Sequence, residues 1–110
     1  MSVRARIGIA LAVVGAIALS PAALADTAVA TKWRPITEAQ PNCLAHARVA
    51  IVNTGFNESE PSSQSMSGKR GDYTASIRCI SEQNIVFFVM SGPSADEALR
   101  YLDQLYARFP

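Results

Sequence analysis

The stretch YTASIRCISEQNIVFFVM, residues 73–90, decides the fold of this chain. Residues 73–80 alternate between apolar and polar side chains, the pattern of a β-strand with one buried face. Residues 85–90 read IVFFVM and are apolar on both faces. Only a short polar turn, residues 81–84, separates the two runs. The stretch therefore predicts an antiparallel β-hairpin.

A helix is expected on each side of this hairpin. Residues 94–109 repeat apolar side chains at helical spacing, and Ser94 with Glu97 forms a capping box at the start. Residues 38–54 show the same spacing, with a second capping box at Thr37 and Gln40. Gly55 suits the left-handed residue that ends a helix.

These elements predict an α+β fold, with two helices packed on one face of a small antiparallel sheet. The expected order is α-(β)-β-β-α within a single domain, residues 37–110. Residues 56–71 have the composition of a loop, and the sequence leaves open whether residues 63–67 form a strand. Residues 26–36 are expected to be a loosely ordered polar lead-in.

The two cysteines, Cys43 and Cys79, are predicted to form a disulfide. They are the only pair in the chain, and both fall on inward faces of the predicted elements. The alternatives are a metal site of Cys43, His46 and Cys79 and a pair of free or redox thiols, although the C-x-x-C spacing of redox centres is absent. Since zinc takes four protein ligands, or three and a water, and no second histidine exists, the disulfide is preferred.

Residues 1–25 have the features of a secretory signal peptide. Arg4 and Arg6 precede an apolar run, and Ala23 and Ala25 are the small residues that a signal peptidase reads. The apolar run is shorter than the roughly 20 residues of a membrane span. We expect cleavage after Ala25, with Ala30 as a second candidate, and no stable membrane anchor afterwards. The predicted location is the periplasm or the extracellular medium.

The charge balance argues against nucleic-acid binding. Cleavage after residue 25 of 110 leaves 85 residues, with eight basic and nine acidic side chains. A net charge near −1 offers no basic surplus for a polyanion. We therefore expect no nucleic-acid partner.

No catalytic constellation is recognisable, and neither a metal nor a cofactor is predicted. The single histidine, His46, would need a nucleophile and an orienting group beside it. Arg78, on the polar side of its strand, is the candidate anion-binding residue. The triplet Arg70-Gly71-Asp72 matches an adhesion signal, but it falls where a hairpin turn is expected, so we interpret it as a turn.

The run IVFFVM raises a difficulty for a two-layer fold. Helices on one face leave either Ile85, Phe87 and Val89 or Val86, Phe88 and Met90 uncovered. Large apolar patches are rarely open in monomers, so Phe87, Phe88, Val89 and Met90 are the candidate interface residues. Self-association through a two-fold sheet contact is the first expectation. Packing by Trp33 and the loop that begins at Phe56 is the second.

The signal segment, the helix beginning near NCLAHA and the strands GDYTASIRC and VFFVMSGPS resemble small exported bacterial domains of unknown function. This resemblance implies export from a Gram-negative cell and an αββα-type fold, and it carries no catalytic residue. Two functional hypotheses follow. One is a non-enzymatic protein-interaction module that binds a protein partner or its own copy. The other is a small ligand-binding protein or enzyme with a site between residues 56–71 and the sheet near Arg78.

Overall fold

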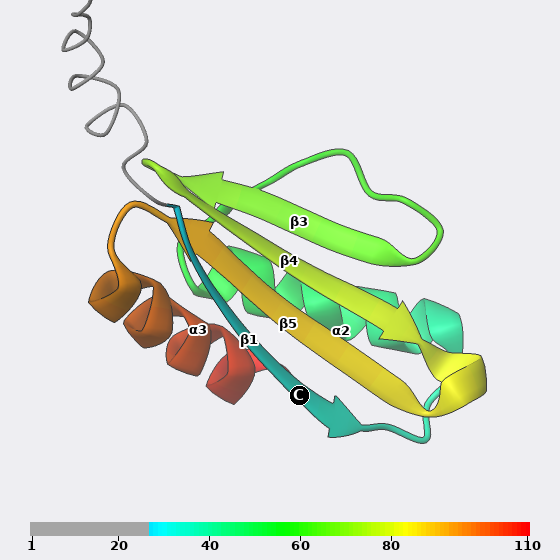
Figure 1. The fold of residues 1–110 in the computed structure, drawn as a ribbon. Coiled ribbons are helices and arrows are strands. Elements are labelled where there is room, and N and C mark those ends of the chain that lie inside the picture. The colour runs from blue at the N-terminus through cyan, green and yellow to red at the C-terminus, as the bar shows by residue number, and fades with distance from the viewer. Residues whose placement is uncertain (1–26) are drawn as a thin grey trace, which may run out of the picture.

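The computed structural model describes residues 27–110, so the predicted signal peptide lies outside the described residues. One five-stranded sheet carries two helices on a single face (Figure 1). The elements follow one another as β1 (Ala28–Pro35), α2 (Gln40–Asn53), β2 (Asn57–Glu58), β3 (Ser65–Arg70), β4 (Tyr73–Ile80), the 3-10 helix η2 (Ser81–Gln83), β5 (Ile85–Gly92) and α3 (Ala95–Arg108). The predicted α+β fold is confirmed.

All neighbouring strands are antiparallel, in the order β1-β5-β4-β3-β2. The predicted hairpin is the pair β4 and β5, joined by η2 and Asn84, whose backbone is left-handed at φ 56°. Helix α2 packs on β3 and β4, helix α3 packs on β1 and β5, and the two helices touch each other. The segment left open in the sequence contributes to β3, Ser65–Arg70.

Residues 28–35 form strand β1, so the expectation of a loosely ordered lead-in is wrong. This strand pairs with β5 over its whole length, from Ala28 opposite Gly92 to Pro35 opposite Ile85. Its inward face carries two cations, which hid the strand pattern in the sequence. Both cations find partners on α3, a helix some 70 residues further along the chain.

Lys32 and Arg34 illustrate how α3 accommodates charged residues on an inward face. The Lys32 ammonium lies 2.9 Å from a carboxylate oxygen of Asp103 and 4.7 Å from the Tyr106 ring centroid. The Arg34 guanidinium lies 4.9 Å from the same ring and donates to the carbonyl of Phe109 at 2.7 Å. Aromatic faces attract cations, so charged side chains can line this part of the sheet.

The predicted disulfide is confirmed. Cys43 of α2 and Cys79 of β4 are bonded, with an S–S distance of 2.03 Å, and both side chains are fully buried. The bond ties the first helix to the centre of the sheet. It also removes the alternative metal site, because bonded sulfurs are no longer thiolate ligands.

The two helix starts differ from each other. Ser94 caps α3 as predicted, since its hydroxyl accepts from the Glu97 amide at 3.4 Å. The capping box predicted for α2 is wrong: the helix begins at Gln40 after Ala39, which has no capping side chain. The Gln40 side chain bonds to the sheet instead.

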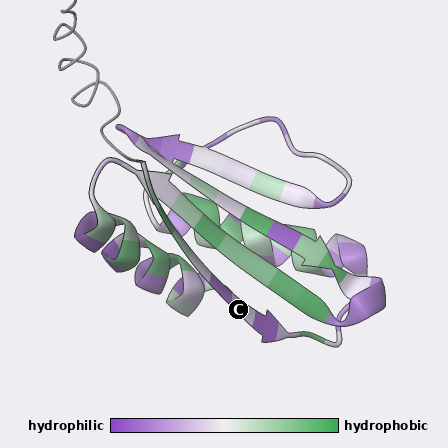
Figure 2. Cartoon of the chain, in the orientation of Figure 1, coloured by the Kyte–Doolittle hydropathy of each residue, from purple (hydrophilic) through white to green (hydrophobic). Residues whose placement is uncertain are grey.

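The core lies between the sheet and the two helices. Figure 2 shows β5 as the most hydrophobic strand and the helices as amphipathic. The largest fully buried side chains come from every layer: Phe88, Ile51, Ile77, Met90, Leu102, Leu105 and Val86.

Candidate functional site

The side of the sheet opposite the helices is the candidate site, and we call it the open face. It faces the viewer in Figure 1, with α2 behind the central strands. Within residues 27–110 both helices pack on the other side. The alternation of each strand therefore decides which side chains the open face presents.

Strand β5 resolves the ambiguity of IVFFVM. Val86, Phe88 and Met90 are fully buried beneath the helices, whereas Phe87 is 37% exposed. Phe87 and its alternate neighbours therefore lie on the open face. Phe88 and Met90 cannot form an interface, so among the four candidate residues the interface prediction stays with Phe87 and Val89.

An exposed tryptophan lies directly beside Phe87. Trp33 of β1 is opposite Phe87 in the β1–β5 register, and its side chain is 59% exposed. Partners opposite each other on one face are close enough for their side chains to touch. The open face thus has an apolar half at its β1 edge, where Trp33 and Phe87 are flanked by partly or wholly exposed apolar residues of β1, β5 and β4: Val29, Pro35, Ile80, Ile85 and Val89.

The other half of the open face is polar. In the same row as Trp33 and Phe87, the next strand contributes Arg78 and β3 contributes Ser65. The row beside it continues from Val89 to Ser76 of β4 and Ser67 of β3. An apolar half around Trp33 and a polar half around Arg78 therefore share one surface.

Arg78 is exposed and donates to the side-chain oxygen of Gln64, so its guanidinium already has a partner. The predicted anion-binding role of Arg78 stays a prediction. Within residues 27–110 the shifted pKa lies elsewhere, at Arg48. There the guanidinium donates to the carboxylate of Glu58 at 2.9 Å, and this hydrogen bond, followed by the negative charge of Glu58, raises the pKa of Arg48 above its usual value.

Intramolecular cover by the loop at Phe56 is excluded. The Phe56 side chain is 3% exposed, and its ring packs edge-on against Tyr101 of α3 at a centroid distance of 5.5 Å. It therefore lies on the helix side of the sheet. Trp33 does lie on the open face, where it forms part of the apolar surface.

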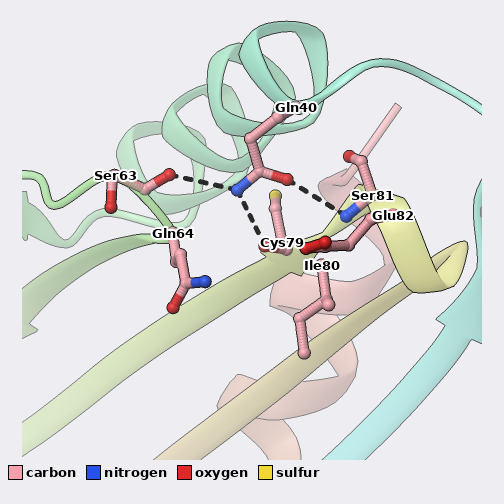
Figure 3. A pocket seen from close by; sticks show the side chains of 7 residues that line it. All are labelled: Gln40, Ser63, Gln64, Cys79, Ile80, Ser81 and Glu82. Atoms are coloured by element: carbon pink, nitrogen blue, oxygen red, sulfur yellow. Dashed lines mark hydrogen bonds between the residues drawn. The ribbon is translucent and has the colours of Figure 1, made fainter.

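A hollow of about 320 Å³ lies between the start of α2, the loop before β3 and the end of β4 (Figure 3). The Gln40 amide crosses it, donating to the carbonyls of Ser63 at 3.1 Å and Cys79 at 2.8 Å. Its oxygen accepts from the Ser81 amide at 3.1 Å. Three hydrogen bonds to backbone groups make Gln40 a structural clamp. The sequence pattern that suggested helix capping gave no sign of this role.

The Ser81 hydroxyl is the exception in this hollow. Its oxygen is buried and has no hydrogen-bond partner among the described residues. Buried polar atoms are usually paired, so an unpaired one next to a hollow deserves a test for a bound ligand. Arg78 is not among the lining residues, which are Gln40, Ser63, Gln64, Cys79, Ile80, Ser81 and Glu82.

The single histidine has a close carboxylate neighbour and a packed ring. His46 Nδ1 lies 2.6 Å from Oε1 of Glu38, and the ring meets Phe109 edge-on at 5.9 Å. Within residues 27–110, no three His, Cys, Asp or Glu side chains come together as metal ligands. The contacts of His46 are those of a packing residue.

The triplet Arg70-Gly71-Asp72 forms the turn between β3 and β4. Gly71 has φ 59°, the conformation that a two-residue hairpin loop requires at its first position. The Arg70 side chain folds back, donating to the Thr54 carbonyl at 2.9 Å and lying 4.8 Å from the Tyr101 ring centroid. An arginine held in this way is not presented for an adhesion receptor.

In the described part of the chain, neither helix has the length and hydrophobicity of a membrane span. The disulfide indicates an oxidising compartment outside the cytoplasm. No protein-family model matches the sequence, and no curated protein is significantly similar to it. Function must therefore be inferred from the residues of the chain itself.

Proposed function

We propose that this protein is a non-enzymatic interaction module of the periplasm or the extracellular medium, and that it binds a protein partner through the open face. The observation that carries this proposal is the pair Trp33 and Phe87, which lie side by side on an uncovered sheet surface.

The energetic reason is the exposure of large apolar side chains in a small domain. Fully burying a phenylalanine side chain stabilises by roughly 1.5 to 3 kcal/mol, so Phe87, which is 37% exposed, forgoes part of that contribution. Tryptophan and arginine dominate the affinity of protein interfaces when a partner desolvates them. Aromatic side chains and arginine are enriched at protein interfaces, and the open face brings Trp33 and Phe87 into one row with Arg78.

Two features support the proposed location. The buried disulfide persists in an oxidising compartment, and the predicted signal peptide provides the route to one. The periplasm and the extracellular medium both meet this requirement.

Site-specific photo-crosslinking in the native cell tests the proposal. A photoreactive amino acid replaces Phe87 in one variant and Val52 in a matched control. Val52 is also an exposed apolar residue, at 47%, but it lies on α2, away from the open face. We expect a discrete crosslinked protein from position 87 and none from position 52.

The same experiment can contradict the proposal. Equal crosslinking from both positions would indicate random collisions, and no crosslink from position 87 would leave the open face without a partner. Phe87→Ser should also remove the complex while lowering the unfolding temperature only modestly, because Phe87 is 37% exposed and lies outside the core between the sheet and the helices.

A ligand site in the hollow beside Gln40 is the second candidate function. The unpaired Ser81 hydroxyl favours it, and small carboxylates or phosphate are the ligands that the Arg78 guanidinium, bonded to Gln64 of the lining, would attract. Titration with acetate and phosphate, followed by amide NMR shifts, tests it. Shifts that cluster at residues 78–82 and disappear in Ser81→Ala would support the site, and unchanged spectra would exclude these ligands.

A further inference from the structure

The outer edge of β1 carries unpaired backbone groups. The Ile36 amide donates to the Asn84 carbonyl at 3.0 Å, next to the pair Pro35 and Ile85. Because bonded pairs alternate along antiparallel strands, the even-numbered residues of β1 bond to β5. The amide and carbonyl groups of Val29, Thr31 and Trp33 therefore point away from the sheet, and no hydrogen bond within residues 27–110 reaches them.

This edge lacks the usual protection against strand pairing. Natural sheets block their edges with outward lysines, prolines or bulges. Here Lys32 and Arg34 fold onto α3, where their charges are satisfied. Pro35 has no amide, but it stands at the end of the strand. The middle of β1, around Thr31, remains available.

A shallow apolar groove of about 160 Å³ runs between this edge and α3. It is lined by Ala28, Val29, Ala30, Thr31, Ala95, Ala98 and Leu99. Leu99 is 51% exposed and Val29 is 63% exposed. Small residues on both walls leave room for another helix and strand to approach closely.

We propose that a second copy of the chain occupies this edge, with β1 pairing antiparallel to β1 of the second copy about a two-fold axis at Thr31. Val29 then lies opposite Trp33 of the second copy, and the two five-stranded sheets become one continuous sheet. This register uses all three free amides and leaves Pro35 beyond the bonded pairs.

The helix layer fits the same arrangement. Helix α3 packs on both β1 and β5, so its axis lies over the space between them. With strands about 4.8 Å apart, the two α3 helices would lie about 10 Å apart across the axis, the distance of directly packed helices. Leu99 and Ala95 of each copy would then be buried against the other. The ion pair of Lys32 with Asp103 lies beside this contact and is neutral overall, so it adds no net repulsion between the copies.

The area of the contact determines its expected strength. A strand of eight residues is about 26 Å long, and the sheet and helix layers together are about 20 Å high. Each copy therefore buries about 500 Å², and the total of about 1,000 Å² is near the lower limit for a specific interface. We expect a dimer that dissociates at micromolar concentrations.

This contact goes beyond the proposed function, because the open face takes no part in it. The two-fold axis is perpendicular to the sheet, so both open faces lie on the same side. Trp33 of one copy then neighbours Val29 of the other, and the two apolar surfaces become continuous. A bound partner would meet a surface twice the length of one open face.

Sedimentation velocity of the disulfide-bonded protein, from about 1 to 500 µM, tests the proposal. We expect the mass to double across this range. Thr31→Pro removes an outward amide without a bond to β5, and it should weaken dimerisation at least about tenfold. Leu99→Glu should do the same from the helix layer. The control is Phe87→Ser on the open face, which should dimerise as the unaltered protein does.

A protein that stays monomeric throughout the range overturns the proposal. So does a dimer that Phe87→Ser disrupts, because that result places the contact on the open face. Amide hydrogen exchange gives a second measurement that needs no variant. Val29, Thr31 and Trp33 should become protected as concentration rises, while Ala30 and Lys32 are protected throughout. Rapid exchange of the three amides in a dimeric sample would also overturn the proposal.

Discussion

Replacing Gly92 with alanine tests how β5 passes beneath α3. A methyl group at this position would lie 2.1 Å from Cδ2 and 2.2 Å from Cε2 of Tyr73. Carbon atoms cannot approach so closely, so the tyrosine ring must move. That ring packs edge-on against Tyr101 at 5.2 Å, and its hydroxyl accepts from the Ser94 amide at 3.1 Å. Gly92→Ala should therefore loosen the start of α3.

The expected cost follows from these contacts. Overpacking a well-packed site costs about 1 to 3 kcal/mol. A lost hydrogen bond adds about 0.5 to 1.5 kcal/mol, and a lost aromatic pair adds a similar amount. Because the ring can recover part of its contacts elsewhere, we expect the free energy of unfolding to fall by about 2 to 4 kcal/mol.

A double-mutant cycle measured by urea unfolding isolates the cause. In a Tyr73→Ala background the clashing ring is absent, so Gly92→Ala should cost little. Gly71→Ala is the matched control: its methyl group meets nothing within 4 Å, and only the φ of 59° opposes it, at about 1 kcal/mol. The reasoning would be refuted if Gly92→Ala lowered the free energy of unfolding equally with and without Tyr73. A loss under about 0.5 kcal/mol in the unaltered background, the size expected for a surface substitution, would refute it as well.

Three further predictions concern the links between layers. The double variant Cys43→Ala, Cys79→Ala loses a crosslink between residues 36 apart, so its free energy of unfolding should be about 4 kcal/mol lower; an unchanged urea midpoint would contradict this. Gln40→Leu leaves three backbone groups without their partner and should cost about 1 to 3 kcal/mol by thermal unfolding, whereas a neutral result would mean that water replaces the clamp. Arg34→Ala removes a cation from the rings of Tyr106 and Phe109 and a hydrogen bond to the Phe109 carbonyl, and should cost about 1 to 2 kcal/mol. Arg78→Ala should stay within about 0.5 kcal/mol, and equal effects would refute the stacking role.

Local patterns in the sequence were enough to predict the β4–β5 hairpin, helix α3 and the disulfide. Alternation between residues 73 and 80, the Ser94 cap and the inward positions of the two cysteines all depend on near neighbours along the chain. Such patterns predict structure because the spacing of apolar residues along a strand or helix defines the face that it buries.

Strand β1 could not be predicted from local pattern, because its inward cations need aromatic and acidic partners that only α3 supplies. The role of Gln40 was hidden for a similar reason, since its partners lie in the loop before β3 and at the end of β4.

For the candidate site too, part could be predicted from the sequence and part depended on the tertiary structure. The sequence alone showed that IVFFVM is apolar on both faces, and it predicted that one of them would need cover. Only the tertiary structure decided that Phe87 faces outward, that Phe88 lies in the core and that Trp33 stands beside Phe87. A run that is apolar on both faces has no alternation to orient it, so the packing of the two helices had to make the choice.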